Sequence, residues 1–120
     1  MDQRPPIWVG HVRLTVGDVG RSADFWADLG LREVERDENI AVFELRGGTH
    51  LLLVPGGPPP ESDAPFDLMV DDLEGTHGAW TGRGLQTSPI ATRPFHSSFT
   101  VRDPDGYLVT VNSSHVVGAV

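Results

Sequence analysis

The chain has 120 residues, of which 38% are hydrophobic and 22% are charged, and this balance is typical of one small globular domain. It contains no cysteine, which excludes disulfides, thiolate nucleophiles and cysteine-ligated metals. The formal net charge is −8, and nine basic residues are scattered along the chain, so a nucleic-acid partner is not expected.

The sequence gives no sign of membrane insertion or export. No apolar run is long enough to span a bilayer. The first ten residues lack the charged-then-apolar pattern of a signal peptide. We therefore expect a cytoplasmic protein without a membrane partner.

The first half of the chain predicts one helix and four strands. Polar and apolar side chains alternate over residues 11–16, which is typical of a strand with two different faces. A helix is expected to follow, with Ser22 as a candidate N-cap and with Gly30 at its end. Three further strand-like runs complete this half, at residues 31–36, 41–46 and 49–54.

The second half repeats this order with weaker signals. Residues 66–70 resemble a strand, and residues 72–82 a glycine-diluted helix that depends on packing by Trp80. Strands at 98–102 and 107–111 flank an Asp-Pro-Asp-Gly sequence, which is a strong turn signal. The pattern does not place the stretch 86–94.

The two halves are related by an internal repeat. Residues 12–31 align without a gap on residues 66–85, a shift of 54 residues (66 − 12). Two such units usually pack on one another. Identical residues recur in the pairs Leu14/Leu68, Val16/Val70, Asp18/Asp72, Trp26/Trp80, Gly30/Gly84 and Leu31/Leu85.

These elements predict an α+β fold with two βαβββ modules that form curved mixed sheets around a cleft. We expect one domain over residues 1–120. Its parts are module 1 at 7–54, a stiff Pro/Gly-rich linker at 55–65, module 2 at 66–113 and a C-terminal tail at 114–120.

Strand alternation predicts which side chains face the cleft. Val12, Leu14 and Val16 should support the first helix, because a helix that crosses a sheet needs an apolar surface beneath it. The polar residues of the same strand, including His11 and Arg13, then face the other way. By the repeat, Asp67 and Met69 occupy the corresponding face in module 2.

Two segments of the sequence carry a resemblance to a known family: GHVRLTVGDVGRSADFWADLGL at the front and FTVRDPDGYLVTV at the back. Together with the paired modules, they resemble the vicinal oxygen chelate superfamily. That superfamily includes glyoxalase I, extradiol dioxygenases, fosfomycin-resistance transferases and bleomycin-resistance proteins. The resemblance implies a curved sheet from each module, an open cleft and a homodimer.

The resemblance also implies four metal-ligand positions, on the first and last strand of each module. Here they are occupied by His11, Leu52, Pro65 and Thr110, and only the first is a good ligand. We therefore expect no metal or other cofactor. The alternative is a divalent metal at a rearranged site formed by His11, His50 and Asp67. His96 and His115 are further candidate ligands.

The leading hypothesis is a metal-independent protein of the bleomycin-resistance-like branch, which binds a small organic ligand and protects by sequestration. Hydrogen bonds from His11 and His50, and charges on Arg13 and Asp67, would hold the ligand. Phe43 and Phe95 would add apolar contact. The full candidate set is His11, Arg13, His50, Asp67, Met69, Thr110, Asn112, Phe43 and Phe95.

Two enzymatic alternatives stay open. One is a metal-dependent glyoxalase-like lyase or a dioxygenase, in which the metal polarises the substrate or activates dioxygen. The other is a metal-free enzyme with His11 or His50 as general base and Arg13 as a stabiliser of developing negative charge. The sequence alone assigns no catalytic residue.

Overall fold

The computed structural model describes residues 4–57 and 62–114. Residues 58–61 of the expected linker and residues 115–120 of the expected tail, with His115, lie outside the described residues. The described residues form two compact units. Unit 1 ends at Gly57, unit 2 begins at Ser62, and each is described by itself.

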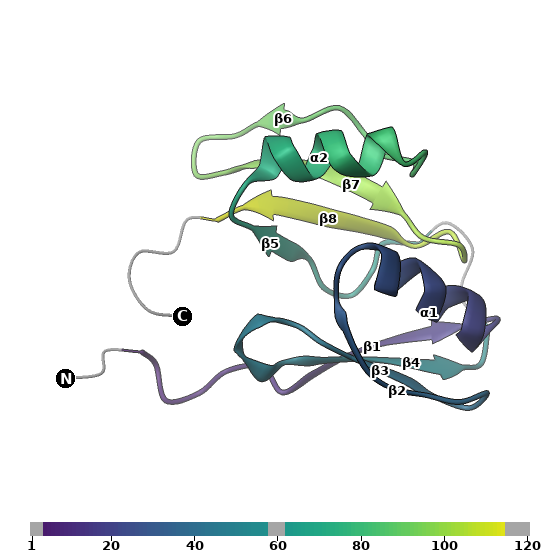
Figure 1. Cartoon of the computed structure of the whole chain (residues 1–120). Helices are drawn as coiled ribbons and strands as arrows, with labels where there is room; N and C mark the ends of the chain where they lie inside the picture. The colour runs from purple at the N-terminus through teal and green to yellow at the C-terminus, as the bar shows by residue number, and fades with distance from the viewer. Residues whose placement is uncertain (1–3, 58–61, 115–120) are drawn as a thin grey trace. The chain divides into compact units, whose positions relative to one another are not determined.

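Unit 1 is a four-stranded mixed sheet with one helix, and it has the predicted βαβββ order (Figure 1). The strands lie in the order β1-β4-β3-β2; β1 and β4 are parallel and the other pairs antiparallel. Its elements are β1 (His11–Val16), α1 (Val19–Asp28), β2 (Arg32–Arg36), β3 (Ala41–Glu44), a 3₁₀ turn (Arg46–Gly48) and β4 (His50–Pro55).

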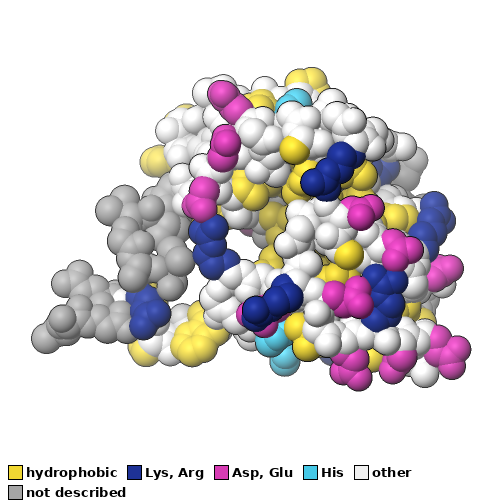
Figure 2. Space-filling model, viewed as in Figure 1, with side chains coloured by type: hydrophobic (Ala, Val, Ile, Leu, Met, Phe, Trp, Pro, Cys, Tyr) yellow, Lys and Arg dark blue, Asp and Glu magenta, His cyan; other side chains and the backbone are white. Residues whose placement is uncertain are grey.

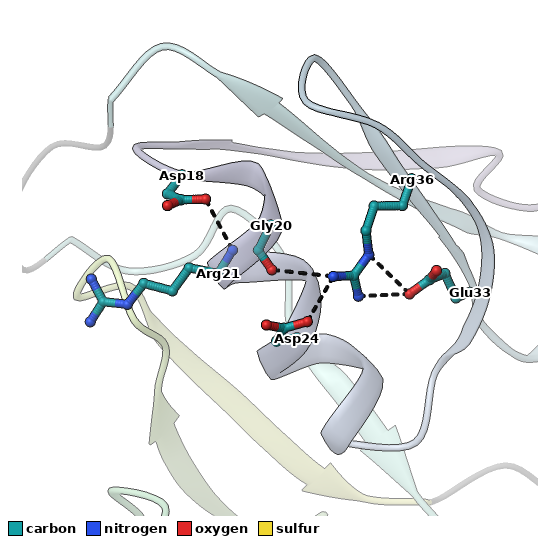
Figure 3. A network of polar contacts seen from close by, with 6 residues as sticks. All are labelled: Asp18, Gly20, Arg21, Asp24, Glu33 and Arg36. Carbon is teal, nitrogen blue, oxygen red and sulfur yellow. Dashed lines mark hydrogen bonds and ion pairs between the residues drawn. The ribbon is translucent and has the colours of Figure 1, made fainter.

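The start of α1 corrects the predicted N-cap. Asp18, not Ser22, caps the helix: its carboxylate accepts a hydrogen bond of 3.1 Å from the backbone N–H of Arg21 (Figure 3). Ser22 lies one turn inside the helix and is fully buried. The predicted end is confirmed, because Gly30 follows the helix with φ of 105°, in the left-handed region.

The core of unit 1 lies between α1 and one face of its sheet. Leu14 and Val16 of β1, Phe43 of β3 and Trp26 of α1 are all at most 1% exposed. Burying each such side chain contributes about 1.5–3 kcal/mol. The predicted strand parity is therefore confirmed for β1, whose His11 and Arg13 alternate with these buried residues and are exposed.

Arg36 joins β2 to α1 (Figure 3). Its guanidinium contacts the Asp24 carboxylate at 2.7 Å and the Glu33 carboxylate at 2.7 Å. These contacts, the one to Asp24 above all, raise the pKa of Arg36. Figure 2 shows Arg side chains in dark blue beside Asp and Glu side chains in magenta on one face. In unit 1, the ion pairs of Arg36 and the pair Arg32–Glu44 offset part of the negative charge.

Unit 2 repeats the topology of unit 1, with strand order β5-β8-β7-β6 (Figure 1). Its helix spans the α1 positions shifted by the same 54 residues (73 − 19). The two-residue strand β6 lies in the stretch 86–94 that the sequence pattern does not place. The elements are β5 (Leu68–Val70), α2 (Leu73–Gly82), β6 (Ala91–Thr92), β7 (Ser97–Arg102) and β8 (Leu108–Ser113).

The helix α2 is held by a capping hydrogen bond at its N-terminus and by ring contacts with the sheet farther along. Asp72 caps it by accepting a 2.9 Å hydrogen bond from the N–H of Gly75. A Cβ added at Gly75 would collide with the Asp72 carboxylate, so this glycine has a structural role that composition does not reveal. Trp80 and His77 pack edge-on against Phe99 of β7, with ring centroids 5.7 and 4.9 Å away, as the dependence on Trp80 predicted.

The predicted turn between β7 and β8 is confirmed. Asp103 is buried and accepts hydrogen bonds from the N–H of Asp105 (3.0 Å) and of Tyr107 (2.8 Å). Burial raises the pKa of Asp103, against the opposing effect of these hydrogen bonds. The chain before β5 also belongs to unit 2, because Leu108 exchanges backbone hydrogen bonds with Ser62 and Ala64.

Candidate functional site

A pocket of about 670 Å³ lies within unit 2. The sheet forms its floor, on the face opposite to the buried core. Every residue that lines it belongs to unit 2, and most carry a polar side chain. The lining residues are Asp67, Met69, Arg93, His96, Ser98, Thr100, Thr110 and Asn112.

Strand register brings the floor residues together. Ser98 pairs with Asn112 across β7 and β8, and Thr100 pairs with Thr110. Asn112 also pairs with Met69 of the parallel strand β5. These residues alternate with Phe99, Val101, Val109 and Val111, which are at most 1% exposed and form the core under α2.

The pocket carries two opposite charges and a row of uncharged polar groups. Asp67 and Arg93 are both exposed, and neither forms an ion pair with another described residue. The side chains of Ser98, Thr100, Thr110 and Asn112 make no hydrogen bond to another residue in the described ranges. Hydroxyl and amide groups both donate and accept, so this surface can bind a polar molecule.

The open face of unit 1 carries a second set of polar side chains. His11 and His50 are direct partners on β1 and β4, with ring centroids 5.9 Å apart and an interplanar angle of 43°. His50 pairs in turn with Glu44, whose carboxylate lies 4.0 Å from the His50 Nε2. Glu44 forms an ion pair with Arg32, and this partner lowers the pKa of Glu44.

The structure distributes the predicted candidates between these two surfaces. Asp67, Met69, Thr110 and Asn112 line the pocket of unit 2. His11, Arg13 and His50 lie on the open face of the sheet of unit 1.

The two aromatic candidates do not join either set. Phe43 pairs with Leu51 on the helix-facing side of β3 and is 0% exposed, so it cannot contact a ligand on the open face, and its prediction is wrong. Phe95 is 88% exposed but is not among the residues that line the pocket.

Sequence reasoning missed three lining residues, Ser98, Thr100 and Arg93, and considered His96 only as a candidate metal ligand. Ser98 and Thr100 could have been found, because they alternate with apolar Phe99 and Val101 in a strand that the pattern predicts. Arg93 and the neighbouring His96 lie in or beside the unplaced stretch, where no periodicity marks which side chains point to the sheet.

The donor set does not fit the divalent metal that the family resemblance implies. At the expected positions, Leu52 and Pro65 offer no side-chain donor and Thr110 only a neutral hydroxyl. No three His, Asp or Glu side chains form a metal-binding group within residues 4–57 and 62–114. The rearranged set of His11, His50 and Asp67 draws on both units and stays a prediction.

Comparison with known proteins identifies the family to which this chain belongs. Residues 8–111 match the model of the Glyoxalase/Bleomycin resistance protein/Dioxygenase superfamily. This match covers most of the chain, and the chain therefore belongs to that superfamily, as the resemblance predicted. No curated protein matches the sequence significantly.

Solved structures share the fold at low sequence identity. Lactoylglutathione lyase from Agrobacterium tumefaciens is 20% identical, with a TM-score of 0.79, covering 97% of this chain and 100% of its own. The antibiotic-binding protein TnmS3 from Streptomyces sp. CB03234 is 21% identical, with a TM-score of 0.78, covering 92% and 98%.

A third similar structure is the bleomycin-binding protein from bleomycin-producing Streptomyces verticillus, in complex with copper(II)-bleomycin. It is 22% identical, with a TM-score of 0.69, covering 92% of this chain and 99% of its own. Such identities show a common fold.

The described part of the chain has no helix that is long and apolar enough to cross a membrane.

Proposed function

We propose that this protein binds a small organic molecule in the pocket of unit 2 without the help of a metal ion. The observation that carries the proposal is the pocket itself: about 670 Å³, a volume within the ~300–1,000 Å³ range of ligand sites. Its polar side chains converge from β7, β8 and the segments that flank β5, β6 and β7, which suits orientation of a bound molecule.

The individual roles follow from the chemistry of each side chain. Asp67 pairs with a cationic group and Arg93 with an anionic one. Asn112 and Thr110 supply hydrogen bonds, and Met69, which is 47% exposed, offers an adaptable apolar contact.

Protection by sequestration is the biological role that we propose for this binding. It is supported by two structural neighbours named as antibiotic-binding and bleomycin-binding proteins. A homodimer in the cytoplasm, with His11, Arg13 and His50 as a second ligand-contacting surface, is part of the same proposal.

A pocket-filling variant tests the proposal. A panel of natural products that includes bleomycin is screened by thermal shift, and hits are titrated by calorimetry. Thr110→Trp should abolish binding, because an indole replaces the open volume above β8. Val34→Trp is the control, since Val34 is 54% exposed on β2 and lies outside the pocket. Equal affinity in wild type and Thr110→Trp would contradict the proposal.

One observation favours a second candidate function, a metal-dependent lyase or dioxygenase. The His11–His50 pair supplies two imidazoles on one surface of unit 1, and a metal held there would need a further ligand, because no three His, Asp or Glu side chains of the described residues form a metal-binding group. Elemental analysis after loading with Ni, Zn, Mn or Fe(II) tests it. Near-stoichiometric metal that disappears in His11→Ala would replace the metal-free proposal.

A further inference from the structure

We propose that the pocket of unit 2 takes an extended zwitterionic ligand. Its cationic end lies at Asp67, its anionic end at Arg93, and hydroxyl or amide groups occupy the middle. This inference rests on the proposed function, because it names the chemical class of the molecule that the pocket binds.

The first support is that the two charges of the pocket do not neutralise one another. Asp67 and Arg93 line the same hollow, yet neither makes an ion pair or a side-chain hydrogen bond with another described residue. A ligand with one charged group would satisfy one of them. A ligand with both satisfies the two ends of the pocket together.

The second support is their placement at opposite edges of the sheet. Asp67 immediately precedes β5, and Arg93 immediately follows β6. These strands are the two edges in the order β5-β8-β7-β6, so three strand spacings of ~4.8 Å separate their backbones by roughly 14 Å.

The two residues are also displaced along the strands. Leu68 pairs with Val111, so Asp67, one residue earlier, lies level with Thr110 and its β7 partner Thr100. Thr92 pairs with Ser97 at the start of β7, so Arg93, one residue later, lies beyond that end of the strand. Asp67 and Arg93 therefore occupy diagonal corners of the floor. Even when the Arg93 side chain reaches inward, the charged ends of a ligand must be on the order of 10 Å apart. A free amino acid is too short.

The third support is the chemistry between the corners. Ser98 and Asn112 form one cross-strand pair and Thr100 and Thr110 the next, and these side chains present hydroxyl and amide groups. An apolar ligand would remove their water without replacing its hydrogen bonds, which is unfavourable. Hydroxyl or amide groups of a ligand replace those hydrogen bonds, while Met69 provides one apolar contact.

Tetraserine is a suitable probe, because its four residues span at most ~14 Å and it carries one charge at each end. The full chain, labelled with ¹⁵N, is titrated with tetraserine and with its N-acetylated, C-amidated and doubly blocked forms. We expect changes in the chemical shifts of the backbone amides of β7 and β8. Blocking either end of the peptide should raise its dissociation constant roughly tenfold.

Substitutions at the two exposed charged residues test which end of the peptide each one contacts. In Asp67→Asn, N-acetylation should no longer weaken binding, while C-amidation keeps its full effect. In Arg93→Gln, C-amidation should lose its effect, while N-acetylation keeps it. Because both side chains are exposed and unpaired among the described residues, both variants should fold. The crossed pattern separates a direct charge contact from general weakening.

The outcomes separate this inference from the proposed function. If the blocked peptides shift the pocket amides as strongly as tetraserine does, the ligand class is wrong while pocket binding stands. If bleomycin shifts these amides and tetraserine does not, the class is also wrong and the proposed function stands. If neither compound, nor any member of the natural-product panel, shifts them, both proposals fall.

Discussion

Thr100 and Thr110 are direct partners across β7 and β8, and both side chains face the pocket rather than the core. Their neighbours in sequence, Phe99, Val101, Val109 and Val111, are buried beneath α2. The same two strands thus build the core with one face and the candidate site with the other. Substitutions on the pocket face should therefore alter binding more than stability.

A substitution at Asn112 tests whether the pocket face affects binding more than stability. Asn112→Ala should weaken binding of a ligand that contacts the pocket about 2- to 10-fold, the effect of losing about 0.5–1.5 kcal/mol of hydrogen bonding. The unfolding free energy should change little, because the Asn112 side chain bonds to no other described residue. Calorimetric titration and urea unfolding measure the two effects. Thr92→Ala, exposed on β6 outside the pocket, should change neither.

Asp18 and Ser22 test the N-cap of α1. Asp18→Ala should lower the unfolding free energy by about 0.5–2 kcal/mol, because the N–H of Arg21 loses its acceptor. Ser22→Ala should be neutral or stabilising, because the buried Ser22 Oγ has no hydrogen-bond partner among the described residues. Urea unfolding compares the two variants. A larger loss in Ser22→Ala would restore Ser22 as the cap.

Two glycines of α2 should respond to alanine with opposite signs. Gly78→Ala should stabilise the protein by about 0.5–1 kcal/mol, because nothing lies within 4 Å of the added Cβ and alanine favours helix. Gly75→Ala should destabilise it, because the Cβ collides with the Asp72 carboxylate that caps the helix. Thermal unfolding of both variants tests this, and stabilisation by Gly75→Ala would contradict the capping geometry.

Asp103 makes stability depend on pH. Burial raises its folded-state pKa above the usual value of 3.8, so the folded protein binds this proton more tightly than the unfolded chain does. The resulting stabilisation is fully present below pH 3.8 and is lost as the pH rises through the raised pKa. Asp103→Asn keeps an oxygen that can accept from Asp105 and Tyr107, but it removes the proton equilibrium.

The unfolding free energy of Asp103→Asn, measured relative to wild type in urea, should therefore increase from pH 4 toward pH 7. A difference that stays constant over this range, or that decreases, would show that Asp103 does not carry a raised pKa.

Much of the fold could be predicted because unit 1 has strong local periodicity and unit 2 repeats its sequence with weaker signals. Alternation over β1, and the repeat that relates Leu14 to Leu68 and Trp26 to Trp80, predicted the βαβββ order and which faces are buried. The N-cap of α1 was misplaced, because Asp18 and Ser22 are both good caps and only the backbone path decides between them.

The candidate site could be predicted only where it lies on regular strands. Parity identified Asp67, Met69, Thr110 and Asn112, which line the pocket. Parity did not place Phe43, because its strand is only four residues long and the pattern did not fix which side chains face the core, where Phe43 lies. Arg93 could not be predicted, because it follows a two-residue strand that is too short to show an alternation of polar and apolar residues.

The central claim, that the pocket of unit 2 is a ligand site, is tested most directly at Met69. The chain has two methionines, so a protein labelled with ¹³C at the methionine methyl groups gives two signals, and Met69→Leu assigns them. We predict that tetraserine or bleomycin shifts the Met69 methyl signal in a saturable manner, and that Thr110→Trp removes this response. A ligand that binds by calorimetry but leaves the Met69 signal unchanged would contradict the account.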